Sequence, residues 1–185
     1  MEEQLNIPED KLITIDVTDE NRETIWSKDV QWKDLKYCRT MSNMLADFPI
    51  DDNEKCIVPI PQANLKDPKL LDLVIEYAGF MRTPEYPREE RKEDAKIDGQ
   101  LTEWEKKWTS EEMDKQTLHE LTLLANYLEF NFLLEPLCLA IAGMFKDKTP
   151  EEIRKEWNIT NDFSKEEEEK IKKENQFIEE AQERK

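Results

Sequence analysis

The sequence predicts an α+β protein in which helices cover a small three-stranded sheet and two further helices extend the C-terminus. Three β-rich stretches lie within the first 61 residues, whereas the apolar residues after them recur at helical spacing. Strands gathered ahead of a run of helices are typical of the α+β class. The last 36 residues contain two more helix starts but few apolar side chains.

The three predicted strands are short and rich in β-branched residues. The first, at 12–17, reads LITIDV, and a turn at 18–22 leads into a returning strand at 23–26. The third, at 56–61, reads CIVPIP; because proline cannot donate to a strand ladder, we expect this strand at an edge of the sheet. A helix is expected before it, where apolar residues recur at helical spacing: Met41, Met44, Leu45 and Phe48.

Helical spacing dominates the chain after the third strand. Asp67 and Pro68 start one helix with a capping side chain followed by proline at the first helical position. Asp114 is expected to cap a later helix, and Pro136 to trim or bend the first turn of the helix after that. The predicted apolar faces comprise Leu70, Leu71, Val74, Ile75, Ala78 and Met81; Trp104 and Trp108; Leu118, Leu121, Leu124, Ala125 and Leu128; and Leu133, Leu134, Leu137, Cys138, Ile141 and Phe145.

These elements predict a core at 11–147 and a two-helix extension at 148–185. Within the core, residues 82–100 are charged and contain two prolines, which favours a flexible surface loop. An exposed helix over 88–96 is the alternative for that segment.

Both extension helices begin with a capping box. Thr149 is followed by Pro150 at the first helical position and by Glu152 three residues after the cap. Ser164 and Glu167 repeat the arrangement.

Composition and charge exclude several classes of partner. The formal net charge is 27 − 44 = −17, which repels nucleic-acid phosphates and anionic membranes, so we expect neither as a partner.

Cys38, Cys56 and Cys138 are far apart without a metal-ligand spacing, and we expect buried, reduced thiols. No secretion signal or long apolar run is present in the sequence, which predicts a soluble intracellular protein.

The sequence offers no active site, so we predict that the protein is not an enzyme and holds no metal or cofactor. Its three glycines form no phosphate-binding loop, and the only histidine, His119, follows an apolar helical position without a nucleophile nearby in sequence. The acidic run at 166–169 is expected to be a solvated helix start, because the helix dipole favours negative charge there.

The extension has too little apolar surface to be ordered by its own packing. Burying one large side chain contributes about 1.5–3 kcal/mol, while ordering each residue costs roughly 1–2 kcal/mol in backbone entropy. We therefore expect this segment to clamp an apolar helix of a partner; packing back onto the core is the alternative. Its apolar strip comprises Ile153, Trp157, Ile159, Phe163, Ile171, Phe177, Ile178 and Ala181.

Three stretches carry a resemblance to a known family. LHELTLLANYLEF at 118–130, KDKTPEEIRKEWNITNDFSKEEEEKIKKENQ at 146–176 and, more weakly, VPIPQANLKDPKLLDLVIEY at 58–77 resemble the S-phase kinase-associated protein family, the adaptors of SCF ubiquitin ligases. The resemblance spans about 12–181. It implies a BTB/POZ-like core that binds a cullin scaffold, and through it indirectly a RING subunit, and two C-terminal helices that bind the F-box of a substrate receptor.

The same resemblance assigns roles to individual residues. Asn126 and Tyr127 match the cullin-facing pair of the family, while Trp157 stands where the family commonly has phenylalanine. Phe177 and Ile178 stand where the family usually ends in Trp-Cys, and Phe132 and His119 depart from it as well. These departures indicate a divergent paralogue with a narrowed or shifted set of F-box partners. The implied F-box contacts are Cys138, Ile141, Phe145, Ile153, Trp157, Ile159, Phe163, Phe177 and Ile178.

The resemblance thus predicts a non-catalytic adaptor for ubiquitin-dependent degradation in the cytoplasm and nucleus. Two alternatives remain open at this point. One is a cullin-independent structural subunit that binds F-box proteins or self-associates weakly; the other is a decoy that occupies F-box proteins without ubiquitination.

Overall fold

The structure is a computed structural model that describes residues 7–46, 56–86, 100–111, 113–146, 148–171 and 173–174. The chain divides into two compact units, Met1–Met144 and Phe145–Lys185. The predicted division into a core at 11–147 and an extension at 148–185 stays a prediction.

The first unit contains a mixed three-stranded sheet, which confirms the predicted α+β class. Strands β1 (Leu12–Thr18) and β2 (Thr24–Gln31) pair antiparallel, and β3 (Cys56–Pro61) pairs parallel to β1, giving the order β2-β1-β3. β3 therefore lies at an edge, as its prolines predicted. β2 extends five residues beyond the predicted end at Trp26. Pairing with β1 continues the strand over a mostly polar segment in which Val30 is the buried residue.

One face of the sheet builds the core. Ile13, Ile15 and Val17 of β1 alternate along the strand and are buried. The opposite face leaves Leu12 and Ile57 exposed. That alternation fixes the register, because a slip by one residue would turn the buried set outward.

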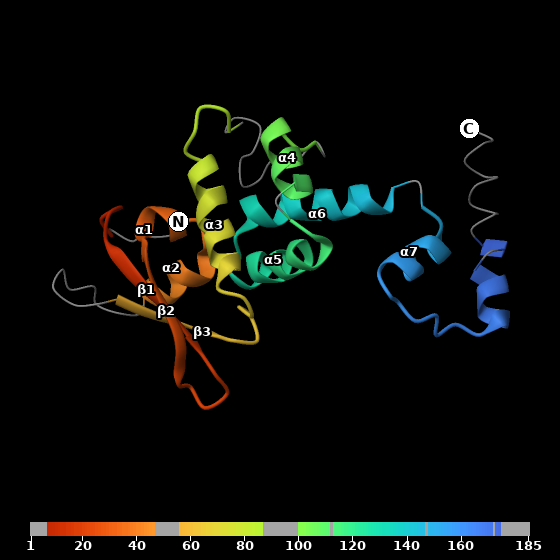
Figure 1. Cartoon of the computed structure of the whole chain (residues 1–185), viewed down its shortest axis with the longest axis horizontal. Coiled ribbons are helices and arrows are strands. Elements are labelled where there is room, and N and C mark those ends of the chain that lie inside the picture. Colours follow the sequence, from red (N-terminus) through yellow and green to blue (C-terminus); the bar gives the residue numbers. More distant parts are fainter. Residues whose placement is uncertain are drawn as a thin grey trace. The chain divides into compact units, whose positions relative to one another are not determined.

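Figure 1 shows how the helices of the first unit are arranged: α3 lies between α1 and α2 on one side and α5 on the other. Pro136 does not trim its helix, since the helix begins five residues earlier and continues through it. The bounds are α1 Trp32–Leu35, α2 Arg39–Ala46, α3 Lys69–Phe80, α4 Glu103–Glu111, α5 Lys115–Tyr127, α6 Asn131–Phe145 and α7 Pro150–Glu156.

Aromatic stacking attaches α4 to α3. The Trp104 ring lies parallel to Phe80 with centroids 4.1 Å apart, and Trp108 lies 5.5 Å from Tyr77. The Trp108 indole also donates to Glu76 Oε2 at 3.1 Å. Such contacts bury large apolar surfaces and fix the angle between the helices.

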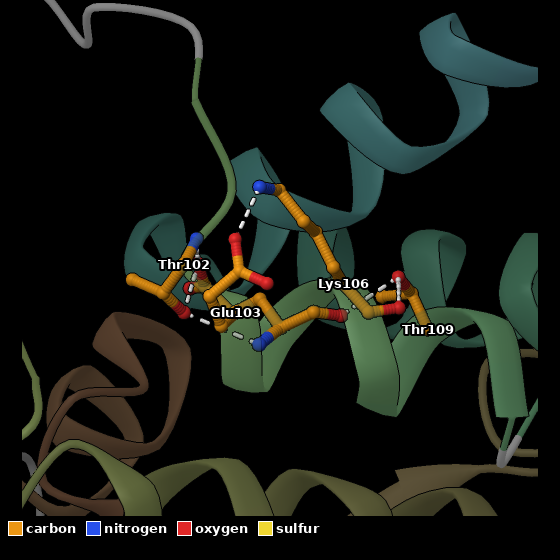
Figure 2. A network of polar contacts seen from close by, with 5 residues as sticks. Thr102, Glu103, Lys106 and Thr109 are labelled. Atoms are coloured by element: carbon orange, nitrogen blue, oxygen red, sulfur yellow. Dashed lines mark hydrogen bonds and ion pairs between the residues drawn. The ribbon is translucent and has the colours of Figure 1, made fainter.

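The start of α4 is tied to the same cluster by a buried carboxylate. Figure 2 shows the network around Thr102, whose backbone N–H and hydroxyl donate to Glu105 Oε2 at 2.8 and 2.9 Å. The Glu105 N–H donates back to the Thr102 hydroxyl at 3.2 Å, which completes a capping box. Tyr77 donates to the other Glu105 oxygen at 2.7 Å, and Glu105 is fully buried. One carboxylate thus caps α4 and joins it to α3.

Several smaller predictions are settled or left aside by the structure. Asp114 caps α5 by accepting from the Thr117 N–H at 2.7 Å, as predicted. Buried thiols were predicted at all three cysteines. This is correct for Cys38 and wrong for the other two, because Cys56 is half-buried and Cys138 is exposed on α6. The predicted helical residue Phe48 and the alternative helix at 88–96 lie outside the described residues. In the part of the chain that the structure describes, no helix has the length and apolarity to span a membrane.

Candidate functional site: two separate surfaces

The C-terminal end of α5 presents the first candidate surface. Asn126 is exposed and Tyr127, the last residue of the helix, is half-buried. Glu129 then adopts a left-handed conformation with φ of 50°, and the Phe130 N–H donates to the Ala125 carbonyl at 2.9 Å. This closing bond ends the helix sharply and holds the Asn126–Tyr127 pair at its tip.

A distant residue caps the same helix end. The Thr40 hydroxyl, at the start of α2, donates to the Tyr127 carbonyl at 2.7 Å, and the Thr40 N–H donates to the Leu128 carbonyl at 3.2 Å. Two carbonyls at the end of α5 are therefore satisfied from α2. The backbone of Tyr127 is fixed before any partner binds.

The half-buried Tyr127 side chain contacts the side chain of Asn64. Its burial raises the pKa of the phenol, and a hydrogen bond with the Asn64 side chain acts in the opposite direction. A half-buried tyrosine beside an exposed amide is a common anchor at protein interfaces. The arrangement suits recognition of a protein surface by apolar contact and hydrogen bonding.

The second candidate surface lies in the second unit and begins with α7. Thr149 and Glu152 form the predicted capping box, with the Thr149 N–H donating to Glu152 Oε2 at 2.8 Å and the Glu152 N–H returning to the Thr149 hydroxyl at 3.3 Å. The hydrogen bond from the Thr149 backbone, and then that from its hydroxyl, lowers the pKa of Glu152. Pro150 follows the cap at the first helical position, as predicted.

Trp157 is the residue that caps the C-terminal end of α7, and hydrogen bonds hold the backbone on both sides of it. The Trp157 N–H donates to Ile153 at 2.9 Å, and the Ile159 N–H donates to Arg154 at 2.8 Å across a left-handed Asn158 with φ of 53°. The Trp157 ring packs on Phe145, with centroids 5.2 Å apart. The structure thus brings two of the predicted site residues, Phe145 and Trp157, into contact.

A small polar cluster positions the next apolar residue, Phe163. The Arg154 guanidinium lies 5.9 Å from the centre of the Phe163 ring and 3.5 Å from Glu168 Oε1. Asn161 also donates to Glu168 Oε1, at 2.7 Å. The carboxylate of Glu168 therefore orients both the arginine below the ring and the turn that leads to it.

A second capping box starts the helical stretch at 165–171. The Ser164 N–H donates to Glu167 Oε2 at 2.9 Å, and the Glu167 N–H donates to the Ser164 hydroxyl at 3.3 Å. The hydrogen bond from the Ser164 backbone, and then the one that its hydroxyl donates to Glu167 Oε2 at 2.8 Å, lowers the pKa of Glu167. Both helix starts predicted in the extension are confirmed.

Large apolar side chains are nevertheless left exposed in this unit. Ile159 is 53% and Phe163 48% exposed, and Ile171 is exposed as well. The local hydrogen bonds hold the backbone around them without covering them. Several exposed apolar side chains within one short segment are typical of surfaces that bind other proteins.

The other predicted contacts are dispersed. Cys138 and Ile141 lie on α6 in the first unit, the former exposed and the latter half-buried, while Ile153 is half-buried on α7. Phe177 and Ile178 lie outside the described residues. The F-box and cullin roles of all these residues stay predictions.

Four positioning residues were missed from sequence. Thr40 and Asn64 contact Tyr127 from distant parts of the chain, and Arg154 and Glu168 flank Phe163. Thr40 and Asn64 carry no local signal, because each acts on a residue far along the chain. Arg154 was detectable as a cation three residues after Glu151 at the acidic start of α7. In the described ranges, no cluster of histidine, cysteine and carboxylate side chains is arranged to hold a metal ion.

Comparison with known proteins adds a family to this geometry. Residues 131–178 match the family model described as "Skp1 family, dimerisation domain". The chain is 38% identical over 140 residues to the SCF ubiquitin ligase complex protein SKP1a of Dictyostelium discoideum, covering 76% of this chain and 82% of the relative. It is 35% identical over 139 residues to Suppressor of kinetochore protein 1 of Schizosaccharomyces pombe (74% and 84%), and 36% over 146 residues to a Skp1-related protein of Caenorhabditis elegans (78% and 81%).

Proposed function

The chain belongs to the Skp1 family, and from that premise we propose that it is a non-catalytic adaptor of an SCF ubiquitin ligase. In this function the second unit binds the F-box of a substrate receptor, and the end of α5 binds the cullin scaffold. The observation that carries the proposal is the pair of exposed apolar residues, Ile159 and Phe163, held on a hydrogen-bonded backbone. The printed name of the Dictyostelium discoideum relative, an SCF ubiquitin ligase complex protein, supports the same assignment.

Each surface is suited to its proposed partner by its chemistry. The second unit offers apolar side chains between polar helix starts, which favours an apolar helix face as its partner. The end of α5 offers a half-buried phenol and an amide, which favours a mixed apolar and polar contact. In the proposed assembly the adaptor only places the substrate receptor, and the transfer of ubiquitin is carried out by other subunits.

The test separates the two surfaces with two double variants of the full chain. Tagged wild-type protein is purified from cells that contain F-box proteins and cullins, and the bound proteins are identified by mass spectrometry. We expect Ile159→Ala/Phe163→Ala to lose F-box proteins, by about tenfold or more, because central apolar anchors dominate binding energy. We expect Asn126→Ala/Tyr127→Ala to lose the cullin and to keep F-box proteins.

Leu12→Ala provides a matched control, because Leu12 and Ile159 are equally exposed at 53% but Leu12 lies on the open face of the sheet. It should recover both partners at wild-type level. Recovery of F-box proteins without any cullin by the wild-type chain would contradict the adaptor function and favour a cullin-independent subunit. Equal recovery by all variants would reject both surface assignments.

A further inference from the structure

The Trp157 side chain has a buried donor that the fold does not satisfy. Its indole Nε1 is inaccessible to solvent and, among the described residues, has no hydrogen-bond acceptor, although the residue as a whole is only half-buried. The indole N–H can only donate, and a buried one usually has a partner. The Trp157 indole N–H departs from this pattern, because it is buried without an acceptor.

The backbone around Trp157 is held by hydrogen bonds, which restricts movement of the indole toward an acceptor. Trp157 closes α7 through its own N–H to Ile153, and the closing bond from Ile159 to Arg154 fixes the residue after the left-handed Asn158. The indole ring itself packs on the Phe145 phenyl ring, with the two centroids 5.2 Å apart. A phenyl ring is at best a weak acceptor.

The unsatisfied donor makes the closed packing costly. Burying a donor without an acceptor destabilises a protein by about 1–3 kcal/mol. The Phe145–Trp157 contact is thus opposed by the polar end of the same indole. Separation of the Phe145 and Trp157 rings would uncover the indole surface that packs on Phe145.

We propose that the Phe145–Trp157 contact is a closed state of the unbound chain, and that an F-box partner opens it by supplying an oxygen acceptor to the Trp157 indole. This inference rests on the proposed function and deepens it. It makes Trp157 a residue that selects among F-box partners. Partners with an acceptor at the matching position bind the open state, whereas partners that are apolar there leave the donor unsatisfied.

The charge of α7 narrows the chemistry of the acceptor. The helix carries three glutamates against Arg154 and Lys155, and Arg154 lies within 3.5 Å of Glu168. A carboxylate brought next to the indole would meet net negative charge, which opposes its approach. The matching acceptor is therefore a neutral oxygen, namely a backbone carbonyl at a helix end or the side-chain oxygen of Asn, Gln, Ser or Thr.

The direct test observes the indole proton by ¹⁵N NMR in the full chain. Trp157→Phe identifies its resonance among those of the five tryptophans, and Phe145→Ala provides the reference for an uncovered indole. In the free wild-type chain we expect an upfield signal that exchanges slowly with solvent. Addition of a recombinant F-box domain recovered in the purification should move it downfield. A signal that is unchanged in the bound chain would overturn the inference.

Affinities of a panel of F-box domains provide the second measurement. Trp157→Phe should weaken the binding of domains with a neutral acceptor by about three- to tenfold, the range of one hydrogen bond. It should leave domains that are apolar at this position unchanged. An equal loss across the panel would show that the ring contributes only apolar area, and would also overturn the inference.

The thermal midpoint of the free chain separates this function from a structural one. Trp157→Phe removes the unsatisfied donor, so we expect an unchanged or raised midpoint despite the smaller ring. A lowered midpoint with unchanged affinities would assign Trp157 to packing alone. If no F-box domain binds the wild-type chain, the proposed function fails and this inference fails with it; binding without the indole shift rejects the inference alone.

Discussion

The helices α4 and α7 begin with the same hydrogen bonds but lie in opposite surroundings. At α4, Thr102 and Glu105 form a capping box in which the glutamate is fully buried and accepts a further bond from Tyr77. At α7, Thr149 and Glu152 form an equivalent box that is exposed. The two starts are therefore chemically alike, and only their packing differs.

The comparison shows that a capping box determines where a helix begins. Packing against other elements then determines whether the apolar side chains near that helix are buried or exposed. The cap bonds are local, because in each helix they join a threonine and a glutamate three positions apart at the helix start. The aromatic residues after α4's cap find Phe80 and Tyr77, whereas Ile159 and Phe163 after α7 stay exposed. A well-capped helix with exposed apolar neighbours is what the proposed function requires of a surface that a partner covers.

The largest expected difference concerns two phenylalanines. Phe80→Ala should lower the free energy of unfolding by about 3–5 kcal/mol, because it leaves a cavity beside the Trp104 ring. Phe163→Ala should change it by no more than about 0.5 kcal/mol, because that ring is already 48% exposed. Urea denaturation followed by circular dichroism measures both. Comparable losses would mean that Phe163 belongs to a folded core.

A smaller difference is expected between the two capping glutamates. Glu105→Ala should destabilise the first unit by about 2–4 kcal/mol, since it removes charged hydrogen bonds from a buried site. Glu152→Ala should leave global unfolding unchanged and reduce only the hydrogen-exchange protection of α7. Glu105→Gln, which keeps an acceptor oxygen, is the control and should lose less than Glu105→Ala. Equal global losses for the two alanine variants would contradict the comparison.

The smallest expected effect is an acid-induced loss of the extension helices. Hydrogen bonds from Thr149 and Ser164 lower the pKa values of Glu152 and Glu167 below their usual 4.5. A lowered pKa stabilises the folded state above the unfolded pKa, and this stabilisation is lost as pH falls through the folded pKa. Helical ¹³Cα shifts at 150–156 should thus hold from pH 7 to about 5.5 and decline below the usual pKa.

The aromatic core should keep its side-chain resonances over the same range. Acidification also neutralises part of the net charge of −17, which relieves repulsion and acts in the opposite direction. Repeating the titration in high salt removes that contribution. A helix at 150–156 that strengthens on acidification in high salt would show that the two caps do not depend on ionised glutamates.

Local patterns in the sequence predicted most of the fold. The strand at 56–61, its edge position, the cap at Asp114 and both extension caps follow from residue types within a few positions of each other. The end of β2 did not, because Ser27 to Gln31 are strand residues only by pairing with β1. Sequence therefore predicts an element best where its own residues, and not a neighbour, determine its conformation.

The candidate surfaces were predicted as residues but not as arrangements. Tyr127 could be predicted from the family resemblance and from its position at the border of an apolar helix face. Its contacts with Thr40 and Asn64 could not, because both residues lie in distant segments of the chain. The Phe145–Trp157 contact and its unsatisfied indole depend on side-chain packing that no spacing encodes. Burial of Cys138 was wrongly expected, since a helical apolar face does not say which of its borders is covered.

The bond from Thr40 to the Tyr127 carbonyl also has a consequence for the order of folding. It joins residues 87 positions apart, and contacts of such separation form late, because a long loop must close first. During synthesis, a chain that contains α2 but not yet α5 cannot form this hydrogen bond. The surface around Tyr127 therefore forms only after α2 and α5 have come together, so any partner that requires this surface would bind only chains that have folded to that point.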